Sequence, residues 1–374
     1  MRLPFTGRAA DPAPSPAPET KSSTTPLVAV ELSRRACFTA HDYGALCREG
    51  FARNPIVYRC VRLIAEAAAS VPLRGALPAG SRAALERFYG YLQVAGAAYL
   101  HAALLGDEVV GLNALRPDTV QAVTDRAGRP AGFAVDGGRG RRVHARDPLT
   151  GRCAVMALTL FNPLDEVTGQ SPLEAAATSV DLHNQGTRWA KSLLDNSARP
   201  SGALVCKGPG GAGMPRDRVE RLKEELERSF SGPMNAGRPM VLEGGLDWTS
   251  MGLSPSDMDF TQSRREAARD IALAFGVPPM LLGIPGDNTY SNYAEANRAF
   301  WRQTVMPLVG RTASALQDWL SGFAEVVDIH PDFSAVPALA GERAQLWAQL
   351  NAAGFIDDDE RRALAGLPPL GTLQ

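Results

Sequence analysis

The sequence is poor in cysteine and in aromatic residues. Its 374 residues include five cysteines, which stand far apart and form no CxxC pair, and 7% of the residues are aromatic. An odd number of widely spaced cysteines does not suit a disulfide framework and favours a reducing compartment. The five histidines are scattered as well. Because no zinc-ligand spacing appears, we expect neither a metal site nor a cofactor.

Long apolar runs and an excess of one charge are also missing. No run approaches the roughly 20 apolar residues that a membrane-spanning helix needs, and the N-terminus lacks the apolar region of a signal peptide, so we expect no membrane association. The formal net charge is −1, so any basic surface must be offset by an acidic one. These properties predict a soluble globular protein made inside a cell.

Motifs of the common enzyme classes are absent or weak. The segment Gly208–Gly213 matches GxGxxG between a predicted strand and a predicted helix, as in dinucleotide-binding folds. However, Pro209 and Pro215 remove backbone donors that a pyrophosphate would need, and the helix predicted over 216–230 has a narrow apolar face. We interpret the segment as a flexible connector and keep a nucleotide-binding enzyme as an alternative. Walker A, GxSxG and HExxH motifs do not occur, which favours a protein that is not an enzyme.

The first half of the chain is predicted to be mixed α+β. Residues 1–26 contain a stretch rich in Pro, Ala, Ser and Thr, which indicates a flexible arm. Apolar residues recur at helical spacing between Asn54 and Pro72, and a second helix is predicted over 82–105. Short strands are predicted over 109–115, 119–124, 132–135 and 153–160.

Two long helices that bracket a small insert dominate the second half. Ser171-Pro172-Leu173-Glu174 is a capping box with proline at the first helical position, and the helix can run to about residue 197. A second capping-box pattern opens at Ser254, and that helix ends at Gly276 before two prolines. Between these helices, residues 201–251 have the pattern of a βαββ insert.

A long loop and further helices follow Gly276. The tip of the loop, Pro285–Thr289, is polar and turn-forming but contains no basic residue, so it cannot bind phosphates strongly. A helix is predicted from residue 290 to 320 with a kink at Pro307. Two short helices, over 341–353 and 357–365, complete the chain.

The helix over 254–276 places like charges four residues apart. Arg265 and Arg269 share one column, and Glu266 and Asp270 share the next. Each repulsion costs only a few tenths of a kcal/mol, so a solvated face accounts for the pattern. Copies arranged side by side in a ring account for it better, because the basic column of one copy could face the acidic column of the next.

Several segments resemble the portal proteins of long-tailed phages, the connectors between head and tail. The resemblance is carried by NPIVYRCVRLIAEAAASVPL, FNPLDEVTGQSPLEAA, the run from RPMVLEGGLDW to AFWRQTVMPL, and AAGFIDDDERRALAGLPPL. Its most specific part is AFGVPPMLLG followed by a helix that starts YSN. A phage, a prophage or a gene transfer agent could encode such a chain.

The resemblance implies a ring of typically twelve subunits at one capsid vertex, located in a virion or virus-like particle and assembled in the cytoplasm of a bacterial host. Double-stranded DNA would pass through the ring during packaging and ejection. The implied partners are further copies of the chain, the major capsid protein, a large terminase that supplies the ATPase, and a head–tail adaptor. A different head–tail connector ring is a further alternative.

The resemblance also implies a portal fold with a fixed division of the chain. Its parts are an N-terminal arm (1–26), an α+β wing (27–170), stem helices (171–198 and 254–276), a βαββ clip (199–253), a tunnel loop with a kinked wing helix (277–323) and a helical crown (324–374).

Three sets of residues are expected to carry this function. The channel-facing tunnel loop contains Gly283, Pro285, Gly286, Asp287, Asn288, Thr289 and Tyr290. The stem and subunit interface contains Arg188, Lys191, Arg264, Arg265, Glu266, Arg269 and Asp270. The clip, which would dock terminase or adaptor, contains Arg216, Arg218, Arg221 and Lys223. A net charge near zero suits DNA that must slide, since tight phosphate neutralisation would hold it.

Overall fold

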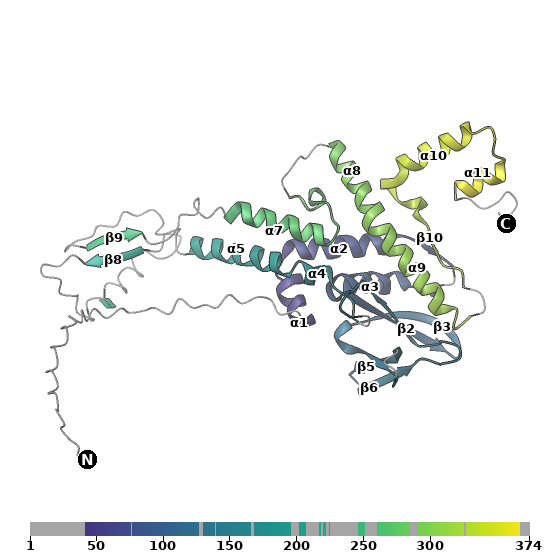
Figure 1. The fold of residues 1–374 in the computed structure, drawn as a ribbon, viewed down its shortest axis with the longest axis horizontal. Coiled ribbons are helices and arrows are strands. Elements are labelled where there is room, and N and C mark those ends of the chain that lie inside the picture. The colour runs from purple at the N-terminus through teal and green to yellow at the C-terminus, as the bar shows by residue number, and fades with distance from the viewer. Residues whose placement is uncertain are drawn as a thin grey trace, which may run out of the picture.

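The chain forms a body of helices and small sheets from which two helices project side by side (Figure 1). The computed structural model describes residues 42–75, 77–126, 130–138, 140–165, 168–195, 202–206, 217, 220–221, 224, 246–250, 260–284, 290–324 and 327–366. The expected arm 1–26 and most of the expected clip 199–253 therefore lie outside the described residues.

The centre of the body is built by α2 (Pro55–Ser70), α3 (Ser81–Ala95) and α9 (Met306–Leu320). Each helix turns its apolar stripe inward, as the spacing of its apolar residues predicts. The stripes meet in one cluster, whose fully buried members include Val57, Ile64, Phe88, Leu92, Val309 and Leu316. The helix expected after Asn54 is thus confirmed.

The described strands form four small antiparallel sheets. One has the order β3-β2-β7, with β2 (Ala97–Leu105) between β3 (Glu108–Leu115) and β7 (Val155–Thr159). The second has the order β4-β5-β6, formed by Val120–Thr124, Pro130–Gly137 and Gly140–Ala145. Tyr99 and Phe133 join the two sheets with their ring centroids 5.8 Å apart. The remaining sheets pair β1 (Leu73–Arg74) with β10 (His330–Pro331), and β8 (Gly202–Cys206) with β9 (Leu246–Ser250).

The helix predicted over 82–105 is wrong beyond residue 95. Gly96 adopts a left-handed backbone with φ 72° and ends α3, and the following residues form β2. Alanine and leucine favour a helix there. However, the side chains of Ala97–Leu105 alternate between buried and less buried, and the strand pairs on both edges. Pairing with β3 and β7, two strands that come later in the sequence, overrides this local preference for a helix.

The other predicted helices that the structure describes are present, with two interruptions. Most of the helix predicted over 216–230 and the predicted helix start at Ser254 lie outside the described residues. The helix after Ser171 is divided at Ala176 into α4 (Pro172–Ala175) and α5 (Ala177–Asp195). The helix before Pro307 consists of α8 (Tyr290–Phe300) and a π-helical turn, η5 (Trp301–Val305). The wider turn directly before the proline accommodates a residue that cannot donate to the helical ladder.

Other elements complete the described chain. They are α1 (Tyr43–Ala45), the π-helix η1 (Leu46–Phe51), η2 (Pro117–Thr119), α7 (Phe260–Ala274), η4 (Pro279–Leu282), η6 (Phe333–Ala335), η7 (Pro337–Leu339), α10 (Ala340–Ala352) and α11 (Asp358–Leu364).

We predict that Gly96→Ala lowers the free energy of unfolding by about 2–4 kcal/mol, because strained left-handed backbone and steric conflict each cost about 1–3 kcal/mol. A Cβ at this position would lie 2.5 Å from the carbonyl oxygen of Gly169. The matched control is Gly80→Ala, where φ is 81° and no atom lies within 4 Å of the added Cβ. Urea unfolding followed by circular dichroism measures both, and equal losses would contradict the steric argument.

Candidate subunit interface and channel segment

The two projecting helices, α5 and α7, run antiparallel and pack against each other (Figure 1). The buried apolar residues of the two helices are mostly alanines. They are Ala177 and Val180 in α5 and Ala267, Ala268, Ile271 and Ala272 in α7, and Ala268 and Ala272 pack with Ile284. Small residues let two helices approach closely. The longer, charged side chains of both helices lie on the outside.

A buried polar group fastens α5 to the body. Asn54 is 1% exposed, and its Oδ1 caps α2 by accepting from the amides of Ile56 and Val57 at 3.0 and 3.1 Å. Its Nδ2 donates to Oδ1 of Asn184 at 3.1 Å and lies 3.3 Å from Nδ1 of His183. One side chain thus caps the start of a helix of the body and holds two successive residues of α5.

His183 acts as an acceptor in this group. Burial lowers the pKa of His183, and nearby Arg264 lowers it further. A neutral imidazole can accept at Nδ1 from the amide of Asn54. The Nδ2 of Asn184 donates to the backbone carbonyl of Glu49 at 2.9 Å, which ties α5 to η1 as well.

An ion-pair group extends this junction to the surface. The Glu49 carboxylate contacts Arg53 at 2.5 Å and Arg188 at 2.9 Å. Arg53 has the largest effect on the pKa of Glu49 and lowers it, and Arg188 lowers it further. Arg188, expected at a subunit interface, is therefore engaged within its own chain while its side chain stays about half exposed.

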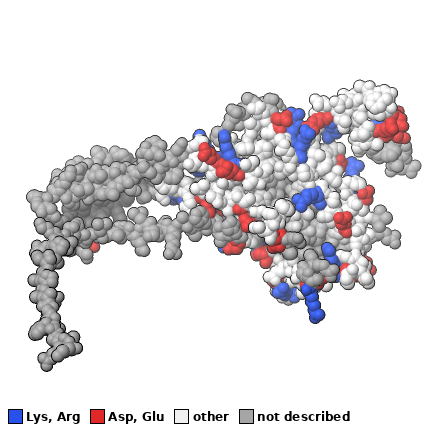
Figure 2. All heavy atoms as spheres, in the orientation of Figure 1, with Lys and Arg blue, Asp and Glu red and all other residues white. Residues whose placement is uncertain are grey.

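The charged residues predicted on α7 lie on its exposed face. Arg264, Arg265, Glu266, Arg269 and Asp270 are all exposed, as is Lys191 on α5. Figure 2 shows basic and acidic side chains next to one another over α7. Within the chain, Gln262 donates to Glu266 at 2.7 Å and Ser179 donates to Asp270 at 3.3 Å. It stays a prediction that the basic column of one copy faces the acidic column of the next copy in a ring.

The start of the expected tunnel loop is held firmly. Gly276, with φ 64°, ends α7 in a Schellman motif, in which Gly276 N–H donates to Leu273 and Val277 N–H donates to Ala272, both at 2.9 Å. The hydroxyl of Thr304 donates to the Gly276 carbonyl at 2.6 Å. Gly283 adopts φ 71°, and the next residue, Ile284, is buried against α7. The loop therefore leaves the body at a position that α7 determines.

The other nominated residues are only partly described. Pro285, Gly286, Asp287, Asn288 and Thr289 lie outside the described residues, as does the side chain of Tyr290. In the expected clip, Arg221 is helical and exposed, whereas Arg216, Arg218, Lys223 and the glycine-rich segment Gly208–Gly213 lie outside. The pairing of β8 with β9 confirms two of the strands expected in the insert.

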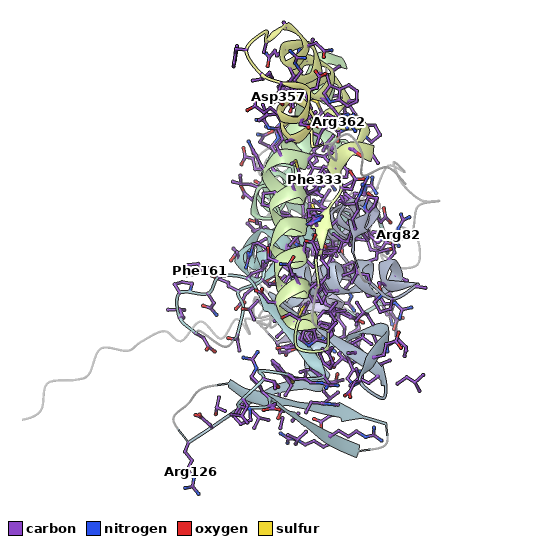
Figure 3. All side chains as sticks on the ribbon, turned by 90° about the vertical axis from the view of Figure 1, so that its right-hand side faces the viewer. Arg82, Arg126, Phe161, Phe333, Asp357 and Arg362 are labelled. Carbon is purple, nitrogen blue, oxygen red and sulfur yellow. The ribbon has the colours of Figure 1, made fainter. Side chains whose placement is uncertain are left out.

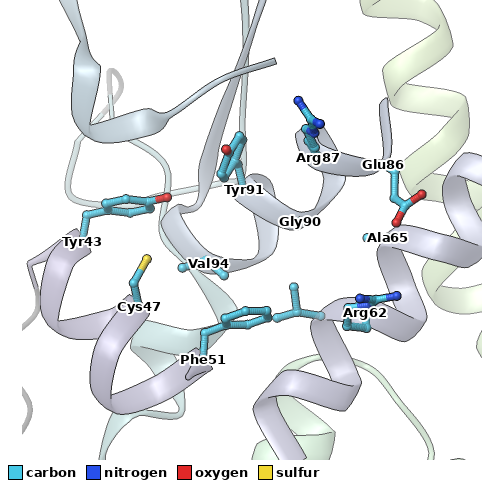
Figure 4. Close-up of a pocket in the computed structure, with 11 residues that line it drawn as sticks. Tyr43, Cys47, Phe51, Arg62, Ala65, Glu86, Arg87, Gly90, Tyr91 and Val94 are labelled. Carbon is cyan, nitrogen blue, oxygen red and sulfur yellow. The ribbon is translucent and has the colours of Figure 1, made fainter. Parts of the chain in front are cut away.

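An apolar pocket of about 330 Å³ lies between η1, α2 and α3 (Figure 4). Phe51, Val61 and Val94 contribute to its walls. Burial raises the pKa of the Cys47 thiol and that of the neighbouring Tyr43 phenol. A thiol with a raised pKa is a poor nucleophile at neutral pH. The pocket contains none of the nominated residues.

Neither a metal site nor a membrane span appears in the described part of the chain. There, no group of three or more His, Cys, Asp or Glu residues is close enough to hold a metal ion. Within the same residues, no helix combines the length and apolar character that crossing a membrane requires.

Comparison with known proteins defines the class to which this arrangement belongs. A chain in the neck of a native gene transfer agent particle, computed with C12 symmetry, superimposes with a TM-score of 0.68 at 46% sequence identity. The match covers 89% of this chain and 95% of that chain. The fold is thus that of a protein found in a particle neck.

The sequence itself identifies the family. The family model described as "Phage portal protein" matches residues 78–366. The chain therefore belongs to the phage portal protein family and has a mixed helix-and-sheet portal fold. The family expected from the sequence is confirmed.

Two relatives illustrate the range of this similarity. A protein of Rickettsia felis described as uncharacterized is 37% identical over 353 residues, which cover 88% of this chain and 91% of the relative. The probable portal protein of Streptomyces phage phiC31 is 28% identical over 297 residues, which cover 75% of this chain and 62% of the relative.

Sequence reasoning missed the junction at the root of the projecting helices. Asn54 directly precedes Pro55 at the start of a predicted helix, which is a recognisable N-cap signal. Nothing local marks His183 and Asn184, since their role depends on a residue about 130 positions earlier.

We predict that Asn54→Ala lowers the free energy of unfolding by about 2–4 kcal/mol. The change removes a helix cap, worth about 1 kcal/mol, and leaves buried polar groups of His183 and Asn184 without their partner, which costs about 1–3 kcal/mol. Chemical unfolding of the full chain measures the loss.

Asn54→Ser separates the two contributions, because serine keeps the cap but cannot reach α5. We expect its stability to lie between those of the parent and Asn54→Ala. If the serine variant matched the parent, the bridge to α5 would contribute nothing.

Proposed function

We propose that the chain is a subunit of a ring, of twelve copies, at one vertex of a phage capsid or gene transfer agent particle. Double-stranded DNA passes through the centre of the ring during packaging and ejection. The observation that carries this proposal is the similarity, over 89% of the chain, to a protein in a neck computed with C12 symmetry. A large terminase, the major capsid protein and a head–tail adaptor are the proposed partners.

The geometry of α5 and α7 supports a ring. In a closed ring each subunit presents two different surfaces, one to each neighbour. α5 and α7 pack against each other and leave the charged face of α7 exposed. That face carries both signs of charge, so one edge of the stem can complement another.

The division of the chain follows from this proposal. Residues 27–170 form the wing, the segments 171–198 and 254–276 the stem, and 324–374 the crown. The clip over 199–253, including Arg216, Arg218, Arg221 and Lys223, faces terminase or adaptor. The segment from Gly283 to Tyr290 lines the channel, and its attachment through Ile284 to α7 fixes its height along the stem.

Imaging of the purified full-length chain tests the proposal directly. Negative-stain class averages should show rings, with twelve-fold symmetry as the expected result. If only monomers or dimers formed, both alone and with the capsid protein present, the proposal would be wrong.

We predict that reversing one charge column weakens the ring. In Arg265→Glu/Arg269→Glu the acidic column of the neighbour would meet acid instead of base, so like charges would repel. Native mass spectrometry at low salt should show a lower fraction of complete rings.

The control exchanges the columns by adding Glu266→Arg and Asp270→Arg to the same chain. If the columns face one another across the interface, this fourfold variant should recover assembly. Undiminished assembly of the double variant would show that the columns do not meet.

We predict that deleting Pro285–Thr289 leaves ring assembly intact but reduces DNA packaging or retention. The segment is polar and carries no basic residue, so it would act as a steric guide. Particle yield and nuclease-protected DNA per particle measure the effect. Replacing the five residues with Gly and Ser keeps the length and tests whether reach alone suffices. A normal yield of particles with fully retained DNA would exclude contact between this loop and DNA.

A further inference from the structure

The C-terminal helices α10 and α11 have no core of their own. Every residue of both helices is described, and none is buried. Large apolar side chains are exposed on the pair and in its connection. Leu346 is 40% exposed, Trp347 44%, Phe355 89% and Leu364 60%. We refer to these four residues as the C-terminal surface.

The pair nevertheless has specific local structure. Asp357 and Glu360 form a reciprocal capping box at the start of α11. Arg361 donates to the carbonyl of Ala353 at 3.1 Å and pairs with Asp358 at 2.7 Å. Between the helices, Trp347, Leu350 and Arg361 border an open groove of about 260 Å³. Such contacts define a helical hairpin, but helices of this length are marginal in water without tertiary packing.

The hairpin is attached to its own chain only lightly. It stands away from the sheets at one end of the molecule (Figure 1), and Figure 3 places Asp357 and Arg362 far from Arg126 on the sheet hairpin. Arg302 of η5 reaches Glu342 of α10 at 3.5 Å, and this pair is solvent-exposed. Exposed ion pairs contribute little stability. Within the part of the chain that the structure describes, the C-terminal surface is therefore left uncovered.

We infer that the C-terminal surface packs against a second copy of this chain. The inference rests on the proposed ring, which places an identical neighbour beside every subunit. Exposed tryptophan and phenylalanine side chains are characteristic of the anchors of protein–protein interfaces. A ring contact joins different surfaces of its two partners, so the hairpin of one copy would complete its packing on its neighbour.

Charge argues against DNA as the occupant. Asp357, Asp358, Asp359 and Glu360 stand in succession at the start of α11. Figure 2 shows acidic side chains gathered over the region of α11. Phosphate groups would be repelled there, whereas a protein surface would not.

The test places a photo-reactive phenylalanine analogue at Trp347 in the purified full-length chain, with no other protein present. Irradiation of assembled rings should give a covalent dimer of two copies, mapped by mass spectrometry. The same analogue at Asp359, on the acidic edge, is the matched control and should give at least fivefold less dimer.

Hydrogen exchange of the unmodified ring supplies a second readout. Amides of α10 and α11 should exchange at least tenfold more slowly in rings than in monomers separated from them. Trp347→Ala/Phe355→Ala should lose this protection, whereas Leu149→Ala, which removes another exposed apolar side chain, should keep it.

Rings that form without crosslinked dimer and without protection of α10 and α11 would overturn this inference and leave the proposed function standing. Absence of rings in images of the same sample would overturn both.

Discussion

The projecting helices depend on a single buried amide at their root. Asn54 caps α2 through its oxygen and holds His183 and Asn184 of α5 through its nitrogen. A buried amide must satisfy its donors and acceptor to avoid a desolvation cost, so this arrangement tolerates little displacement. The direction of α5 relative to the body is thereby defined. Since α7 packs antiparallel along α5, the axis of α7 follows that of α5.

The outer surface of α5 and α7 is charged. Its charged side chains are exposed, and some have partners within the chain, such as Arg188 with Glu49 and Asp270 with Ser179. Exposed charge contributes little to the stability of one subunit but strongly affects which surfaces can meet. Buried apolar residues therefore hold α5 and α7 in place, and the exposed faces of the two helices determine which surfaces they can contact.

Much of the fold was predictable because its signals are local. Capping residues and helical periodicity correctly gave the helices after Asn54, Ser171 and Asp357, and Gly276 correctly gave the end of α7. The failure over 97–105 has a physical cause, since this alanine-rich segment becomes a strand only by pairing with residues 108–115 and 155–159. The same holds for the junction at Asn54, whose partners on α5 are recognisable only after folding. The spacing of charged residues predicted the charged face of α7, but it could not show that Arg188 forms an ion pair with Glu49.

The projecting helices and the C-terminal hairpin leave opposite kinds of side chain exposed. In α5 and α7, alanines and Ile271 are buried within the subunit, and the charged residues remain outside. At the C-terminal hairpin the order is reversed, because Trp347 and Phe355 are exposed while the polar caps are satisfied internally. Polar exposure costs an isolated subunit little, whereas exposure of large apolar side chains forgoes roughly 1.5–3 kcal/mol for each one that could be buried. In an assembly of identical copies, the hairpin would therefore supply hydrophobic stabilisation and the stem would supply selectivity. A ring built in this way need not rely on strong charge pairing next to its channel, which is compatible with the passage of a polyanion.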